Sequence, residues 1–126
     1  MKRIILLSIF VLFISVCKSQ AQSVYQKQTD SVSALVVKYF NERASDKLYA
    51  LTSKSVHSKF KPNQWKDIFE SNFYPYGKIK ERKFLKFEMA VGAYRVAFDS
   101  GTFLLMTLKI GSDKKIVDLN FNPYKK

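Results

Sequence analysis

The stretch YRVAFDSGTFLLMTLKI, residues 94–110, decides the fold class of this 126-residue chain. Apolar side chains alternate with other residues up to Phe98, which is the period-two pattern of a strand. Residues 99–101 (Asp-Ser-Gly) predict a three-residue hairpin loop, because the glycine can adopt the positive φ that such a loop needs. Residues 102–110 are apolar on both faces, which predicts a central strand covered on both sides.

Two further strands flank this hairpin in the sequence. Residues 79–89 alternate in their second half, and residues 116–121 alternate throughout. We expect turns at residues 90–93, around Gly92, and at residues 111–114. The predicted apolar faces consist of Leu85, Phe87 and Met89 in the earlier strand and of Val117, Leu119 and Phe121 in the later one.

Helical periodicity precedes the strands. We expect helices over residues 29–41 and 45–52 and a third that begins at Pro62, while residues 53–61 are ambiguous. Helices followed by a meander of four strands are typical of an α+β domain with the helices packed on one face of an antiparallel sheet. The predicted buried stripes are Val32, Leu35, Val36, Tyr39 and Phe40 in the first helix and Trp65, Ile68, Phe69 and Phe73 in the third.

Residues 1–21 have the pattern of a secretory signal peptide. Two basic residues precede the apolar run Ile4–Val16, which is shorter than the roughly 20 residues that span a bilayer. Small residues then end at Ala21, and we expect cleavage there and export to the periplasm or the extracellular space. Lipidation of Cys17, which would bring the chain to a membrane, is the disfavoured alternative, because the residue before it is Val16 rather than a small one.

Composition narrows the classes of protein and of site that this chain can form. Residues 22–28 are expected to form a flexible lead-in and residues 29–126 a single domain. The chain has 22 basic and 10 acidic residues, and three of the basic ones lie in the leader. One histidine and one cysteine exclude a Cys/His zinc site and a disulfide framework. Export also removes access to cytosolic ATP and nicotinamide, so no cofactor is expected. No metal is expected either, because the sequence has no spaced set of metal ligands.

A family resemblance rests on core aromatic and apolar positions spread over residues 32–124. The stretches that carry it are residues 39–41, 46–51, 77–80, 93–96, 103–108 and 119–124. In these the chain resembles the nuclear transport factor 2-like (cystatin-like) superfamily, and within it an uncharacterised family of secreted bacterial domains. The resemblance implies a curved sheet that wraps a long helix into a cone. In some proteins such a domain precedes a penicillin-binding-protein-like serine hydrolase; here we expect an accessory role to such an enzyme only if a separate chain supplies it.

Catalytic motifs are weak in this chain. Ser-x-x-Lys occurs at residues 15–18, in the leader, and at residues 112–115, in a predicted turn where the helix that this motif needs is missing. His57, the only histidine, is expected to be exposed. Relatives of the superfamily that act as enzymes place Asp, Tyr or His inside the cone, but in the predicted register Glu88 and Asp118 lie opposite the apolar faces. We therefore expect no catalytic residue.

The excess of basic residues is the remaining feature of the sequence that points to a function. The segment from Lys78 to Lys86 concentrates five positive charges, and a second group lies between residues 54 and 66. Such a face could meet an anionic cell-envelope component or an acidic protein, whereas nucleic acid is disfavoured by export. It could equally be a solvated face that protects a sheet edge. The candidate ligand-binding residues are Lys78, Lys80, Arg82, Lys83, Lys86 and Tyr94.

Three function classes follow. The leading hypothesis is an exported, non-catalytic binding or accessory domain whose cone mouth or basic face engages a ligand. The alternatives are a small cone-fold isomerase, dehydratase or hydrolase, and a structural homodimer that pairs through the open sheet face around residues 103–110. A polar cavity with an ionisable group at its base would favour the enzyme, whereas a cavity lined by apolar side chains would favour binding or structure.

Overall fold

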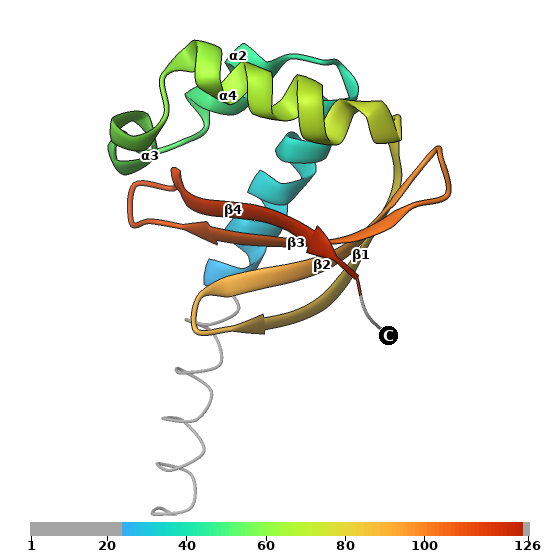
Figure 1. Cartoon of the computed structure of the whole chain (residues 1–126). Helices are drawn as coiled ribbons and strands as arrows, with labels where there is room; N and C mark the ends of the chain where they lie inside the picture. Colours follow the sequence, from blue (N-terminus) through green and yellow to red (C-terminus); the bar gives the residue numbers. More distant parts are fainter. Residues whose placement is uncertain (1–23, 125–126) are drawn as a thin grey trace, which may run out of the picture.

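The computed structural model describes residues 24–124 (Figure 1). The N-terminal helix is helical from residue 24 to residue 41, and short helices follow it before the sheet. The predicted signal peptide, its cleavage site and Cys17 lie outside the described residues. The short helices are α2 (Ser45–Ala50), α3 (Lys54–Lys59), α4 (Pro62–Ile68), the π-helical turn η1 (Phe69–Phe73) and the 3₁₀ turn η2 (Tyr74–Tyr76).

Four strands form one antiparallel sheet in the order β1-β2-β3-β4. The N-terminal helix, blue in Figure 1, lies against this sheet, and α2 to α4 lie together along one side of it. The α+β prediction, with helices packed on a four-stranded antiparallel sheet, is confirmed. The strands are β1 (Ile79–Glu88), β2 (Val91–Phe98), β3 (Phe103–Ile110) and β4 (Ile116–Pro123).

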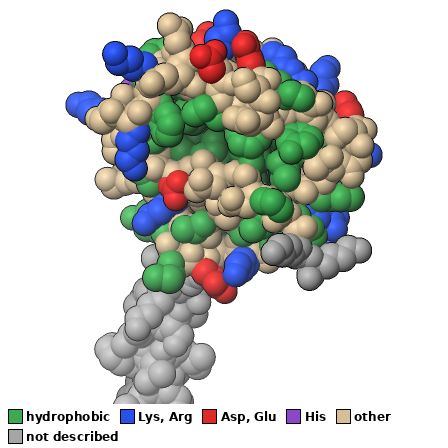
Figure 2. All heavy atoms as spheres, viewed as in Figure 1, with side chains coloured by type: hydrophobic (Ala, Val, Ile, Leu, Met, Phe, Trp, Pro, Cys, Tyr) green, Lys and Arg blue, Asp and Glu red, His purple; other side chains and the backbone are tan. Residues whose placement is uncertain are grey.

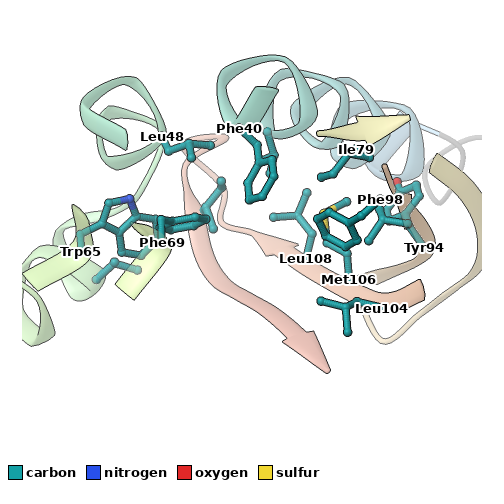
Figure 3. Close-up of a cluster of buried hydrophobic side chains, with 14 of the residues drawn as sticks. Phe40, Leu48, Trp65, Phe69, Ile79, Tyr94, Phe98, Leu104, Met106 and Leu108 are labelled. Atoms are coloured by element: carbon teal, nitrogen blue, oxygen red, sulfur yellow. The ribbon is translucent and has the colours of Figure 1, made fainter. Parts of the chain in front are cut away.

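The core lies between the helices and the inner face of the sheet (Figure 3). Phe40, near the end of the N-terminal helix, is its centre, with aromatic neighbours from η1, η2, β2 and β4 at centroid distances of 5.0–6.2 Å. Asn41 fixes this helix end to the sheet: its amide group donates to the carbonyl of Ile79 and accepts from the amide of Ile79, at 2.9 and 2.8 Å.

The N-terminal helix differs from its prediction in two respects. Residues 24–28, expected as a flexible lead-in, are helical. Leu35, expected on the buried stripe, is 36% exposed, because the buried positions of this helix are Thr29, Ser33, Val36 and Phe40. Small polar residues occupy the first half of the stripe where the helix comes closest to the sheet, and a search for apolar residues alone overlooks them.

The turn between β1 and β2 was predicted wrongly. It consists of Met89 and Ala90, with φ of 51° and 65°, as a type I′ turn requires. Gly92, expected in the turn, lies buried in β2. Its lack of a side chain serves packing, because a Cβ there would stand 2.9 Å from Cγ2 of Thr29. By contrast the loop after Phe98 is as expected, with a positive φ of 89° at its glycine.

The prediction that β3 is covered on both sides is also wrong. Leu104, Met106, Leu108 and Ile110 are buried on the inner face, whereas side chains of the outer face are exposed or half-buried. Phe103 is the most exposed apolar residue of this strand. The strand is central in the sheet, as expected, but helices cover only one face. Within residues 24–124, no helix has the length and apolar character that crossing a membrane demands.

Candidate functional site

An apolar hollow of about 380 Å³ opens between the short helices and strand β4. Figure 2 shows it as a green depression in the face viewed, with charged side chains at its edge. The lining comes from α3, α4 and η1 on one side and from the edge strand on the other. The residues that line it are Val56, Lys59, Phe60, Trp65, Ile68, Phe69, Phe73 and the six consecutive residues Ile116–Phe121.

Local structure explains how the hollow is held open. Pro62 begins α4 in the first turn, where a missing N–H costs nothing, and places Trp65 one turn later. The π-helical turn η1 then follows, and its wider winding brings Phe69 and Phe73 beside the sheet. Phe73 stacks at 4.9 Å on Phe121 of β4. The helices therefore touch β4 at one end of the hollow.

A second contact closes the other end. Ile116 at the start of β4 forms a parallel bridge with Thr52, with backbone hydrogen bonds of 2.8 Å to Leu51 and Ser53. The Tyr49 hydroxyl donates to the carbonyl of Phe60 at 2.7 Å and so fixes the segment between α3 and α4. Between these two contacts the edge of β4 stands apart from the helices, which leaves the apolar space.

The polar groups of the hollow lie at its rim. Lys59, Asp118 and Asn120 are all exposed, whereas Trp65 at the wall is only 7% exposed. The Nε1 atom of Trp65 is buried and has no hydrogen-bond partner within residues 24–124. All ten carboxylates of the chain are exposed or half-buried, including Glu88 and Asp118. The hollow thus has an apolar wall and a charged rim.

The predicted basic face is divided by the sheet. Lys78 and Lys80 are exposed where β1 begins, and Lys83 and Lys86 pair with the outward residues Arg95 and Ala93 of β2. Arg82 lies on the inner face instead. Strand alternation and two register shifts in β1 thus separate Arg82 from the four lysines, which are exposed.

Arg82, predicted as a ligand contact, binds the N-terminal helix. Its guanidinium donates to the carbonyl of Asp30 at 2.9 Å and to the hydroxyl of Ser33, and its ion pair with the Asp30 carboxylate is 3.4 Å long. It also stacks 5.3 Å above the ring of Tyr94. This single side chain thus ties the N-terminal helix to β1 and β2.

Tyr94, also predicted as a ligand contact, is 1% exposed and lies in the core. Its hydroxyl has no hydrogen-bond partner in the described part of the chain. Burial raises the pKa of Tyr94 above its ordinary value of 10.0, since the charged phenolate is disfavoured away from water. Tyr74 has a raised pKa for the same leading reason, partly offset by the charge of Arg43.

We expect Tyr94→Phe to leave the free energy of unfolding at pH 7 unchanged or raised by up to about 1 kcal/mol, because it removes an unpaired buried hydroxyl. Stability from a raised tyrosine pKa is complete below about pH 10 and is lost as the pH rises through the folded-state pKa. The variant should therefore lose less stability above about pH 10, measured by urea unfolding at each pH. Tyr25→Phe, which removes an exposed hydroxyl, is the control. An alkaline profile of Tyr94→Phe identical to the parent's would contradict the prediction.

The candidate nucleophiles and bases are not assembled into a catalytic group. His57 is exposed, as expected, and its ring stacks 4.1 Å from that of Tyr49, with Nε2 3.0 Å from the Tyr49 carbonyl. Ser112 lies in the turn before β4, as expected, with no helix after it. In the chain from residue 24 to residue 124, no three histidine, cysteine or carboxylate side chains gather as a metal site would require.

Comparison with protein-family models, with curated proteins and with solved structures returned no match to this chain. The similarity to the nuclear transport factor 2-like superfamily therefore stays a prediction. The hollow itself was not predicted. The periodicity indicated Trp65, Phe69 and Phe121 as buried residues, but a space between helices and an edge strand depends on their separation, which no spacing along the chain reveals.

Proposed function

We propose that this chain is an exported, non-catalytic binding domain, and that its ligand is a small amphiphile with an alkyl chain and an anionic head group. One observation carries the proposal: a hollow of about 380 Å³, walled by aromatic and aliphatic side chains, opens at the surface beside β4. Pockets that hold small molecules in proteins have volumes of roughly 300–1,000 Å³ and are mainly apolar. The hollow lies at the small end of that range, which suits a single alkyl chain.

The rim supports an anionic head group. Residues 54–61, which form α3 and the approach to α4, carry three lysines and no acid, and Lys59 lines the hollow. Asp118 is the opposing charge at the rim, so the ammonium of Lys59 is the group to which a carboxylate or phosphate can bind. The overall excess of basic residues adds a long-range attraction for anions.

The enzyme alternative finds less support. An acid–base mechanism needs an ionisable group within an apolar cavity, where its pKa is shifted towards neutrality. The ionisable groups of this hollow, Lys59 and Asp118, are exposed at the rim. The cone interior beyond them is filled by Phe40, Leu48 and Met106 (Figure 3), so a substrate would not reach a buried acid there.

Trp65 provides a direct test, because it lines the hollow and is the only tryptophan of the chain. Titration with decanoate below its micelle concentration should shift the Trp65 emission in a saturable way. Decyltrimethylammonium, which has the same chain and the opposite charge, should bind more weakly. An unchanged emission with both probes would overturn the proposal, and equal affinity for both would remove the anionic head group from it.

The rim charge can be tested by Lys59→Glu. We expect decanoate to bind about fivefold more weakly, which corresponds to about 1 kcal/mol, the size of an exposed ion pair. Lys38→Glu makes the same charge change at an exposed position of the N-terminal helix and should leave the affinity within about twofold. If both variants weaken binding equally, general attraction by the basic chain explains the result and Lys59 has no specific role.

A further inference from the structure

A second surface without an assigned role lies at the end of the molecule where the described helix begins. Residues 24–124 expose seven large apolar side chains, and five of them belong to two segments, the first turn of the described helix and the β1–β2 hairpin. We call these five the apolar end. They are Val24, Tyr25, Phe84, Leu85 and Met89.

Three observations place the two segments side by side. Phe84 lines a shallow hollow together with Gln26 and Lys27 of the helix. Arg82 of β1 holds Asp30, and Gly92 of β2 lies against Thr29. The start of the N-terminal helix and the turn of the β1–β2 hairpin lie at the same end of the molecule, where they meet in Figure 1.

Met89 is the residue at this end that folding does not explain. It is 93% exposed and occupies the first central position of the type I′ turn, with a φ of 51°. Such turns favour Asn-Gly, because side chains other than those of asparagine and aspartate are disfavoured at positive φ. The chain thus holds a long apolar side chain in water, in a backbone conformation that opposes it.

Leu85 is directed outward by a β-bulge. The pairing of β1 with β2 shifts register between Phe84 and Lys86, which leaves Leu85 as the extra residue of a bulge. Bulges redirect side chains, and here an apolar one becomes exposed. Lys83 and Lys86 flank Phe84 and Leu85 in the sequence, and Lys27 lies beside Phe84. Within residues 24–124, Lys86 pairs with Glu88 at 3.6 Å, while Lys27 and Lys83 make no ion pair.

We propose that the apolar end docks on the surface of an anionic phospholipid bilayer, with Met89 and Leu85 inserted among the head groups and the lysines beside the lipid phosphates. Exposed apolar side chains next to cations are the combination that binds such an interface.

The test is co-sedimentation of the full chain, as purified from an exporting cell, with vesicles. Vesicles containing about 30% phosphatidylglycerol should bind it and pure phosphatidylcholine vesicles should bind it far less, and salt should weaken the binding. Met89→Asn should reduce the partition coefficient about tenfold, because it removes the inserted side chain. The same variant suits the turn better and should unfold at no lower urea concentration than the parent.

Phe103→Ser is the matched control, since it removes another exposed apolar side chain from the outer face of β3 and should leave vesicle binding unchanged. Three results would overturn the proposal: no binding to anionic vesicles, binding that Met89→Asn does not weaken, or a dimer in solution that Met89→Asn dissociates. The second result would assign the binding to another surface of the protein, and the third would assign the apolar end to self-association. The proposal that the hollow beside β4 binds an amphiphile is tested separately by Trp65 emission, so either proposal can fail alone.

Discussion

Phe40→Ala should lower the free energy of unfolding by about 3–5 kcal/mol, measured by urea unfolding with circular dichroism. Phe40 is fully buried and contacts the rings of Phe69, Tyr74, Phe98 and Phe121. Removing it deletes the transfer free energy of the ring and leaves a cavity at the point where helix, turn and sheet meet. Because domains of this size are stable by only about 5–15 kcal/mol, this loss removes roughly a fifth or more of the total stability.

Leu35→Ala on the same helix is the matched control. Both residues belong to the stripe predicted from helical periodicity, but Leu35 is 36% exposed and Phe40 is not exposed at all. We expect the control to cost less than about 1 kcal/mol, since much of its side chain is already in water. A loss for Leu35→Ala equal to that for Phe40→Ala would mean that the helix packs with a different face against the sheet.

Gly92→Ala should be the second most damaging substitution, with a loss of about 1–3 kcal/mol. Its new Cβ would stand 2.9 Å from Cγ2 of Thr29 and 3.0 Å from Cε2 of Tyr94, closer than van der Waals contact permits. Both neighbours are buried, so neither can rotate into water. The helix must therefore move away from β2, which also stretches the bonds from Arg82 to this helix.

A double-mutant cycle with Thr29→Ser separates this clash from a general weakening of the strand. The serine lacks the Cγ2 atom that the new methyl group meets, so we expect the double variant to lose less stability than the two single variants together. Purely additive losses would contradict the close packing of the helix on Gly92. They would then point to the conformational preference of the strand as the cause.

Much of the fold could be predicted from local pattern. The alternation in residues 94–98 and the loop before Thr102 specify a hairpin, because both the period-two pattern and the glycine with φ of 89° are properties of adjacent residues. Pro62 marks a helix start for the same kind of reason. The wrong turn at Gly92 has a clear cause: a glycine placed for contact with a distant helix resembles, in sequence, a glycine placed for a turn.

The candidate site was much less predictable. A run of basic residues in β1 predicted one ligand-binding face, but alternation and two bulges send Arg82 inward and Lys83 outward. The apolar residues of the hollow were predicted as core, which is what Trp65 and Phe69 largely are. Whether such residues meet or leave a space depends on the wide turn of η1 and on the bridge between Thr52 and Ile116, and these are contacts between distant parts of the chain.

The sequence alone determined the α+β class, the strand count and order along the chain, and the excess of positive charge, because each depends on neighbouring residues or on composition. Only the tertiary structure decided which face of the N-terminal helix is buried, why Gly92 has no side chain, and where Arg82 points. It also decided that a hollow lies beside β4 and that the β1–β2 hairpin and the start of the N-terminal helix lie at the same end. These features depend on distances between segments far apart in the chain, and packing sets such distances, whereas periodicity carries no record of them.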